Sequence, residues 1–175
     1  MLKNSGMQLD DIFEDLEAMF EGQLLATNTG TPMDACNLIR VRNNAGETFE
    51  LALPILGDDF LAGMRLGAND FHVARYSTIT RIQFVHLTDE SIPLLRILDC
   101  DLDMFIGDLP KPLEFLWRVL GQKDYTAGIL AQVVNSIVII EQAGTASIVG
   151  VPLQALTELR VSSVESSSAS FTVSQ

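Results

Sequence analysis

Residues 50–84 read ELALPILGDDFLAGMRLGANDFHVARYSTITRIQF, and their pattern occurs a second time in the chain. A shift of 77 residues places this stretch without a gap on residues 127–161, AGILAQVVNSIVIIEQAGTASIVGVPLQALTELRV. Many apolar positions coincide, while three residues are identical: Leu53 with Leu130, Gly67 with Gly144, and Thr80 with Thr157. A pattern repeated at a fixed spacing indicates a duplicated structural unit. We therefore expect one small β-unit in each half, and a single sheet spanning both halves would contradict this expectation.

Short apolar runs bounded by turn residues predict five strands in each copy. In the first copy we expect strands at residues 37–42, 47–56, 59–66, 71–75 and 78–85. In the second we expect them at residues 114–120, 125–133, 136–142, 145–150 and 156–161. Pro54 predicts a bend or an edge in the second of these strands, because proline cannot donate to a neighbouring strand. Five short, closely spaced strands predict a small, strongly bent barrel.

An amphipathic helix is predicted over residues 8–25, before the first barrel. Apolar residues recur there at spacings of three and four, which places them on one face. The predicted interaction face consists of Leu9, Ile12, Phe13, Leu16, Met19 and Phe20. This face either covers one open end of the following barrel or contacts the same helix of a second chain.

The predicted fold class is therefore mainly β with an N-terminal α-helix and two tandem five-stranded small barrels. Its parts are a helix and linker, a first barrel, a connector, a second barrel and a disordered tail, at residues 1–33, 34–87, 88–112, 113–162 and 163–175. The connector is the hardest part to interpret. It is either a helix from Leu94 to Met104 or, as we favour, an extended segment with a helical piece.

The chain is strongly acidic, which bears on its partners. Eleven lysines and arginines face 23 carboxylates, so the formal net charge is −12. Proteins that bind nucleic acid concentrate positive charge, and this chain would repel both nucleic acid and anionic membranes at long range. The sequence has neither an apolar run long enough to span a bilayer nor a secretory signal. We therefore expect a cytoplasmic protein, in which Cys36 and Cys100 are thiols.

Signatures of catalysis or of metal binding are missing from the sequence. Asp99, Asp101 and Asp103 resemble the start of a calcium loop. That loop needs glycine at its sixth position and glutamate at its twelfth, where this chain has Met104 and Pro110. The two histidines, His72 and His86, have no nucleophile at a motif distance. We predict no enzyme activity, no metal and no cofactor.

The second copy carries a motif that suggests a family. Gly128, Leu130, Val133, Asn135 and Ile137 are followed by the VPLQAL segment at residues 151–156. This pattern resembles the Sm-like, or SH3-like, small barrels, which include the bacterial RNA chaperone Hfq. The layout is also similar to tandem actinobacterial proteins with an N-terminal helix, and PRC-type barrels share the VPLxAL ending.

The resemblance implies RNA binding and ring assembly, but the family's RNA-binding residues do not transfer. Ala62-Gly63 stands where the Sm pattern has an asparagine. Tyr76-Ser77 and Leu153-Gln154 stand where Hfq has a lysine-histidine pair. The fold can be inherited without the ligand.

Our leading hypothesis is a non-catalytic interaction or scaffold protein that contacts protein partners through its barrel edges and its acidic helix. Self-association into a homo-oligomer is a second expectation. The alternative is a protein that binds RNA or single-stranded nucleic acid, which the net charge disfavours. It requires a cluster of five arginines on one surface: Arg40, Arg42, Arg75, Arg81 and Arg118.

Overall fold

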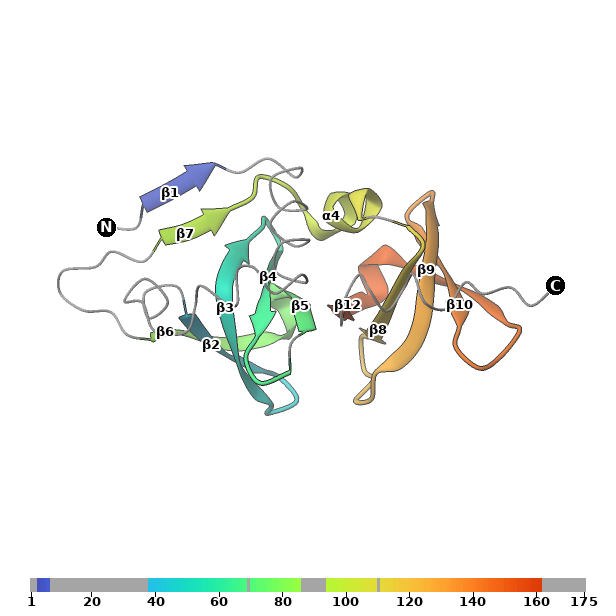
Figure 1. Ribbon diagram of the computed structural model, residues 1–175, viewed down its shortest axis with the longest axis horizontal. Coiled ribbons are helices and arrows are strands. Elements are labelled where there is room, and N and C mark those ends of the chain that lie inside the picture. The colour runs from blue at the N-terminus through green and yellow to red at the C-terminus, as the bar shows by residue number, and fades with distance from the viewer. Residues whose placement is uncertain (1–2, 7–37, 69, 86–93, 110, 162–175) are drawn as a thin grey trace.

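The chain is built mainly from β-strands, as predicted. The computed structural model describes residues 3–6, 38–68, 70–85, 94–109 and 111–161. Its strands are β1 (Lys3–Gly6), β2 (Leu38–Asn43), β3 (Thr48–Leu56), β4 (Phe60–Arg65), β5 (Asp70–Arg75), β6 (Ile79–Val85), β7 (Leu94–Ile97), β8 (Leu113–Val119), β9 (Thr126–Val134), β10 (Ile137–Gln142), β11 (Ile148–Pro152) and β12 (Leu156–Val161). These residues also form the α-helix α4 (Leu102–Asp108) and the 3₁₀ turns η1 (Tyr76–Thr78) and η2 (Leu153–Ala155) (Figure 1).

Both halves of the chain use the same strand order. Antiparallel pairing in the first half gives the order β6–β2–β3–β4–β5. In the second half it gives β12–β8–β9–β10–β11. In each case the fifth strand of the half lies beside the first, and a 3₁₀ turn precedes it. The pairing does not close either half into a ring of strands within the described residues.

Strand β3 bends where the sequence predicts it. Its pairing with β4 shifts register between Ala52 and Ile55, on either side of Pro54. A bulge accommodates proline because the residue needs no ladder hydrogen bond there. Beyond the bend, Ile55 and Leu56 pair in parallel with β7. Strand β3 therefore pairs with β2 before the bend and with β7 after it.

Backbone hydrogen bonds repeat with the spacing of 77 residues. The Tyr76 N–H donates to the Asp59 carbonyl at 2.9 Å, and the Leu153 N–H donates to the Ser136 carbonyl at 2.9 Å. Tyr76 and Leu153 each begin the 3₁₀ turn of their half, 77 positions apart. The sequence repeat is thus confirmed as a repeat of backbone geometry.

A side-chain hydrogen bond repeats in the same way. The Thr80 hydroxyl donates to the Arg42 carbonyl at 3.2 Å, and the Thr157 hydroxyl donates to the Arg118 carbonyl at 3.0 Å. This explains why threonine is one of the three identities: in each half the hydroxyl ties the fifth strand to the first. Arg81 and Glu158, the next residues along, occupy equivalent positions with opposite charge.

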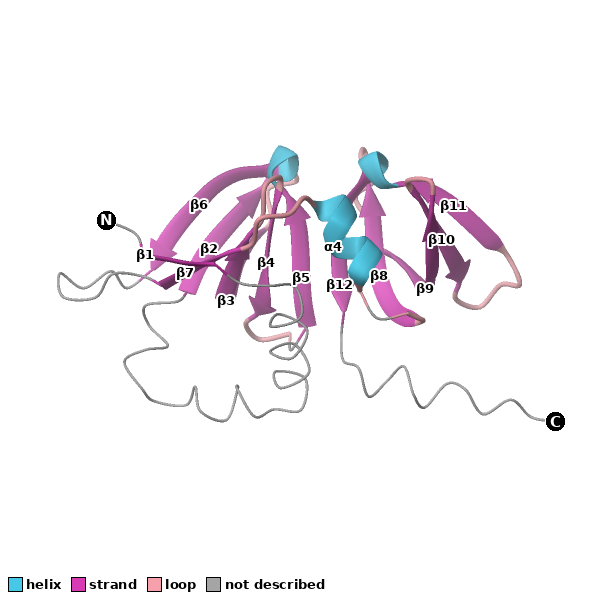
Figure 2. Ribbon diagram, turned by 90° about the horizontal axis from the view of Figure 1, so that it is seen from above, coloured by secondary structure: helices cyan, strands magenta, loops and turns pink. Residues whose placement is uncertain are grey.

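A single sheet crosses the molecule, and here the expectation of two separate units is wrong. Strand β5 of the first half pairs antiparallel with β12 of the second, with Val73 opposite Leu159 and His72 opposite Arg160. All twelve strands therefore belong to one sheet. Figures 1 and 2 show the halves side by side, with β5 and β12 in the middle. We call this β5–β12 contact the join.

The larger hydrophobic core also spans both halves. It contains Phe71 and Val73 from β5 together with Trp117 and Leu159 from the second half, all at most 6% exposed. Helix α4 covers this core: the Phe105 ring lies 5.1 Å from that of Phe60 and 6.4 Å from that of Phe71, between centroids. A smaller core belongs to the first half alone: Ile39, Val41, Phe49, Leu51, Leu61 and Ala74.

The connector is part strand and part helix. Residues Leu94–Ile97 form β7, so a helix from Leu94 to Met104 is wrong there, whereas the helical piece that we favoured corresponds to α4. Strand β7 pairs in parallel with both β3 and β1. The Asp101 carboxylate caps α4 by accepting from the Met104 N–H at 2.8 Å, a stabilising arrangement at a helix start.

Several predictions fall outside the described residues. These are the helix over residues 8–25 with its interaction face, Cys36, His86 and the tail at residues 163–175. In the part of the chain that is described, α4 is too short to cross a bilayer.

Candidate functional site

The join holds a cluster of buried polar side chains around Glu158. Its carboxylate is 2% exposed and accepts hydrogen bonds from His72 Nε2 at 3.0 Å, from the Tyr125 hydroxyl and from Arg118 Nη2. His72 comes from β5, Arg118 from β8, and Tyr125 from the turn before β9. We call these four residues the join cluster.

The electrostatics of the join cluster follow from this geometry. Burial alone would raise the pKa of Glu158, but the hydrogen bonds from His72, Tyr125 and Arg118 outweigh burial and lower the pKa to about 2. Burial also dominates at His72, where it lowers the pKa despite the neighbouring carboxylate. At neutral pH the cluster therefore contains an ionised Glu158 facing a charged Arg118, with an uncharged His72 beside them.

Stacked rings hold the cluster in place. The Phe49 ring stacks on the His72 ring with centroids 4.3 Å apart. The guanidinium carbons of Arg118 and Arg160 lie 4.5 and 4.0 Å from the centre of the Tyr125 ring. Such contacts favour arginine over lysine at these positions.

The ionisable groups at the centre of the join cluster are buried. A carboxylate touching a histidine is the usual material of acid–base catalysis, but His72 is 0% and Glu158 2% exposed. A substrate cannot reach either group in this conformation. The cluster instead neutralises charge at the contact between the two halves.

Arg75 also links the two halves of the chain, outside the join cluster. Its guanidinium binds Asp59 at 2.5 Å and Asp103 at 3.0 Å. It also donates to the carbonyls of Leu153 and Leu156, each at 2.7 Å. One side chain therefore links the end of β5 to α4, to the first residue of η2 and to the first residue of β12.

The five arginines proposed for nucleic-acid contact do not lie on one surface. Arg75 and Arg118 are held in the ion pairs of the join. Arg40, Arg42 and Arg81 do come together: Arg42 lies opposite Arg81 in the pairing of β2 with β6, and Arg40 follows on the same face of β2. All three are exposed. We call them the arginine face.

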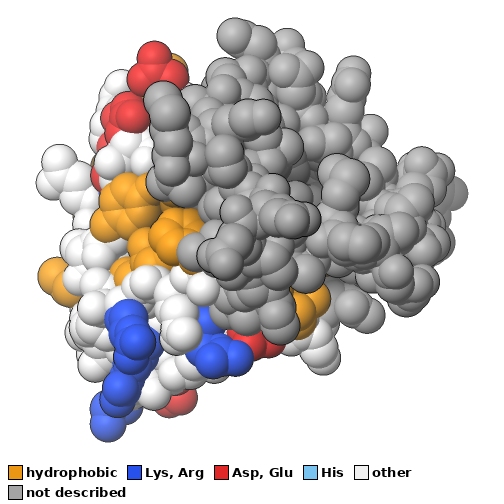
Figure 3. Space-filling view, turned by 90° about the vertical axis from the view of Figure 1, so that its left-hand side faces the viewer, with side chains coloured by type: hydrophobic (Ala, Val, Ile, Leu, Met, Phe, Trp, Pro, Cys, Tyr) orange, Lys and Arg blue, Asp and Glu red, His pale blue; other side chains and the backbone are white. Residues whose placement is uncertain are grey.

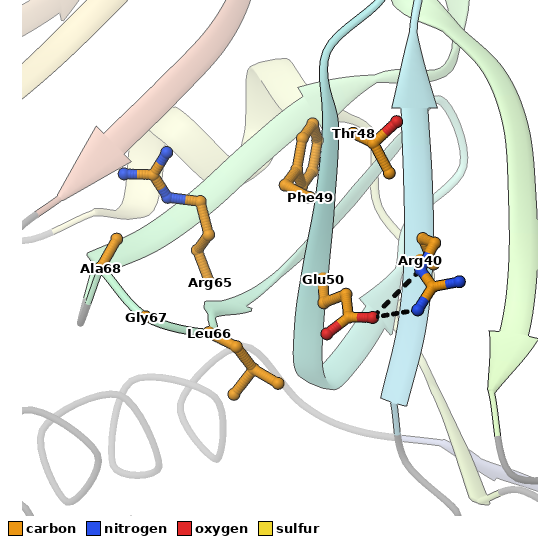
Figure 4. A pocket seen from close by; sticks show the side chains of 8 residues that line it. All are labelled: Arg40, Thr48, Phe49, Glu50, Arg65, Leu66, Gly67 and Ala68. Atoms are coloured by element: carbon orange, nitrogen blue, oxygen red, sulfur yellow. Dashed lines mark hydrogen bonds and ion pairs between the residues drawn. The ribbon is translucent and has the colours of Figure 1, made fainter.

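A shallow pocket of about 510 Å³ lies beside the arginine face (Figure 4). Its lining residues are Arg40, Thr48, Phe49, Glu50, Arg65, Leu66, Gly67 and Ala68. Arg40 is paired with Glu50 at 2.6 Å, and Arg65 is paired with Asp70 at 2.7 Å. Because both guanidinium groups are neutralised locally, the pocket presents little free charge to a ligand.

Three strand edges are open in the described structure. Strands β1 and β11 end the path of the sheet, and β6 pairs with β2 alone. Strands β11 and β6 each carry an exposed aliphatic side chain: Ile148 on β11 is 67% exposed, and Ile82 on β6 is 36% exposed. On the side of the molecule where β6 lies, cationic side chains gather beside a hydrophobic area (Figure 3).

The acidic connector makes structural contacts. Asp101 caps α4, Asp103 binds Arg75, and Cys100 is a buried free thiol whose pKa burial raises to about 11. A group of three or more metal-ligating side chains is not found within the described ranges.

The sequence interpretation missed the join cluster. Arg118 was predicted to lie on an exposed arginine surface and Glu158 was given no role, because they stand in strands whose partners could not be known. The sequence contains little signal for the cluster, because Thr157 and Glu158 of β12 are polar. In the structure, the residues from Phe71 to Ala74 and from Leu156 to Leu159 are buried without alternation. Such strands are covered on both faces, so their polar residues need internal partners.

Comparison with known proteins adds no identity to this geometry. Neither a protein-family model nor a curated protein matches the chain. The features of the described structure that bear on function are the join, the open edges and the arginine face.

Proposed function

We propose that the chain is a non-catalytic, cytoplasmic scaffold protein that joins partners, including copies of itself, through the edges of two Sm-like small barrels. The amphipathic segment at residues 8–25 supplies a further contact surface in this proposal. The observation that carries it is the join itself. There, two repeat units associate by pairing one open strand of each.

The internal repeat indicates which edges would pair between copies. Strand β5 is the fourth strand of its unit, and its equivalent in the second half is β11. Strand β12 is the fifth strand of its unit, and its equivalent in the first half is β6. Because β5 and β12 are already paired, β11 of one copy and β6 of another are the two edges left to form the same contact.

The join also supplies a register for that contact. Val73 lies opposite Leu159 in the join, and a shift by 77 residues places Gly150 opposite Ile82 between copies. The Leu153 N–H, directly after β11, donates to the Ser136 carbonyl directly before β10, and the inward-pointing groups alternate from there along the antiparallel pair. The Gly150 N–H therefore points to the open side, where it can donate to a second copy.

A proline at Gly150 tests the proposal. Gly150→Pro removes the outward N–H, and an edge strand tolerates proline at such a position. Gly150→Ala is the matched control. It keeps the N–H, and its Cβ, which proline also has, would meet the Ile137 Cγ2 methyl group closely, at 3.1 Å.

The measurement is molar mass by light scattering over a concentration series, with circular dichroism to check folding. We expect the parent chain and Gly150→Ala to associate as concentration rises, and folded Gly150→Pro to remain monomeric. A parent chain that is monomeric at every concentration would refute self-association. Equal association of the two variants would refute the β11 edge.

A further inference from the structure

The arginine face contains an arrangement that is unfavourable without a counter-anion. Arg42 and Arg81 stand directly opposite each other on neighbouring strands. Like charges in this position repel and destabilise a strand pair. Arg40, the third member, is satisfied by Glu50, but no carboxylate among the described residues pairs with Arg42 or Arg81. Two of the eleven lysines and arginines of the chain thus lie where their charges repel each other.

The same strand offers more than charge. No strand among the described residues pairs with the outer edge of β6. Ile82 projects on the side of the sheet opposite to Arg81, since neighbouring side chains of a strand point to opposite faces. Ile82 pairs with buried Val41 and is itself 36% exposed. A strand added to this edge would therefore meet guanidinium groups on one face and an aliphatic side chain on the other.

We propose that β6 and the arginine face form a docking site for an extended acidic peptide of a partner protein. The peptide adds to the edge of β6 through its backbone and alternates acidic with apolar side chains. Its carboxylates bind Arg81 and Arg42, while its apolar residues cover Ile82. This inference rests on the proposed function in one respect, that the open edges of the chain recruit strands.

A peptide fits this surface better than a nucleic acid does. Backbone N–H and C=O groups of an open strand are satisfied by another strand, and a phosphate chain cannot supply that pairing. Single-stranded nucleic acids also use aromatic platforms, whereas the side chains beside the arginines on this face are Gln83 and Glu50. Because the net charge of the protein is −12, it repels a long nucleic acid more strongly than a short acidic peptide.

The test uses fluorescence anisotropy with three labelled probes. They are a seven-residue peptide that alternates glutamate and valine, the same peptide with glutamine in place of glutamate, and a ten-nucleotide uridine RNA. We expect the glutamate peptide to bind about tenfold more tightly than the glutamine peptide, which corresponds to about 1.4 kcal/mol. We also expect its affinity to fall as salt rises. Equal affinity for both peptides, or retention of the RNA in preference to the peptide, would overturn the proposal.

Charge-matched variants locate the site. Arg81→Ala and Arg42→Ala each lower the affinity for the glutamate peptide several-fold without lowering the melting temperature, because each removes a repulsion in the free protein. Lys123→Ala, a loss of one exposed positive charge in the turn between β8 and β9, leaves the affinity unchanged. An equal effect of Lys123→Ala would show non-specific charge attraction and refute this site.

The docking site and the self-association can fail independently. A second copy's β11 and the acidic peptide would occupy the same edge of β6, so they compete for it. Gly150→Pro changes β11 but leaves β6 intact, so it abolishes association between copies and keeps peptide binding. Loss of peptide binding in folded Gly150→Pro would contradict the assignment to β6. Peptide binding by a parent chain that never self-associates would support this inference and refute only the β11 contact.

Discussion

The contribution of an ion pair to the free energy of unfolding depends on how deeply the pair is buried. Glu158 and Arg118 are both nearly inaccessible, whereas Arg40 and Glu50 form an exposed pair. Removing one member of a buried pair leaves an uncompensated charge, which costs far more than the loss of a surface pair.

Glu158→Gln should therefore lower the free energy of unfolding by about 3 kcal/mol or more. The isosteric control Glu50→Gln should change it by less than about 1 kcal/mol. Urea denaturation of both variants measures the difference. Similar effects of the two substitutions would contradict the importance of burial at the join.

His72 makes stability depend on pH in a definite direction. Burial holds its pKa in the folded protein below the ordinary value of 6.5, so the unfolded chain binds the proton more tightly. The contribution of His72 is fully present above pH 6.5 and is lost as pH falls below it. Glu158, whose pKa is lowered to about 2, adds a second loss between about pH 4.5 and pH 2.

We expect the melting temperature to decline between pH 7 and pH 5 in the parent chain, and His72→Gln to weaken that decline. Thermal denaturation followed across this range measures both slopes. An unchanged slope in the variant would assign the decline to other groups.

Strands and turns follow the sequence more closely than their partners do. The predicted strand at residues 156–161 coincides with β12, and most other strands agree within a residue or two, because alternation and turn residues act locally. The first strand residue of β11 was predicted three positions too early, because Thr145 to Ser147 form part of the turn. Strand β7 was missed because its neighbour β3 lies about forty residues earlier in the chain.

The two equivalent turns should respond equally to substitution. Gly67 and Gly144 have φ angles of +82° and +75°, with open space where a Cβ would stand. Gly67→Ala and Gly144→Ala should each cost about 1 kcal/mol through backbone strain alone. Gly107→Ala in α4 also meets open space, but it should gain about 0.5 kcal/mol by helix propensity. The denaturation midpoint should fall in the two turn variants and rise in Gly107→Ala. Any other result would contradict this explanation from backbone conformation.

The whole molecule should unfold in one step. A sheet and a core that cross the join make each half depend on the other, so the division into separate barrels at residues 34–87 and 113–162 should not appear as two transitions. Trp117, the only tryptophan, reports on the second half, and far-UV circular dichroism reports on both. We expect coincident unfolding curves from the two probes. Two resolved calorimetric transitions would show independent halves.

The long-range features could not be predicted because they depend on pairs distant in the chain. His72 and Glu158 are 86 residues apart, and Arg118 and Glu158 are 40 apart. The sequence indicated that two similar units exist, but the local pattern of each unit does not predict which of their strands pair with each other. The exposure of Arg40, Arg42 and Arg81 could be predicted, whereas the burial of Arg118 and the partial burial of Arg75 depend on the join.

The join is head-to-tail: a fourth strand of one unit meets a fifth strand of the next, and the two surfaces differ. A contact of this kind has no symmetry of its own that ends growth. If copies repeat it, the angle between the two halves of a chain fixes the outcome. An angle that divides a full turn evenly gives a closed circle with two units per chain, and any other angle gives an open spiral. Electron microscopy of concentrated protein would distinguish circles from spirals.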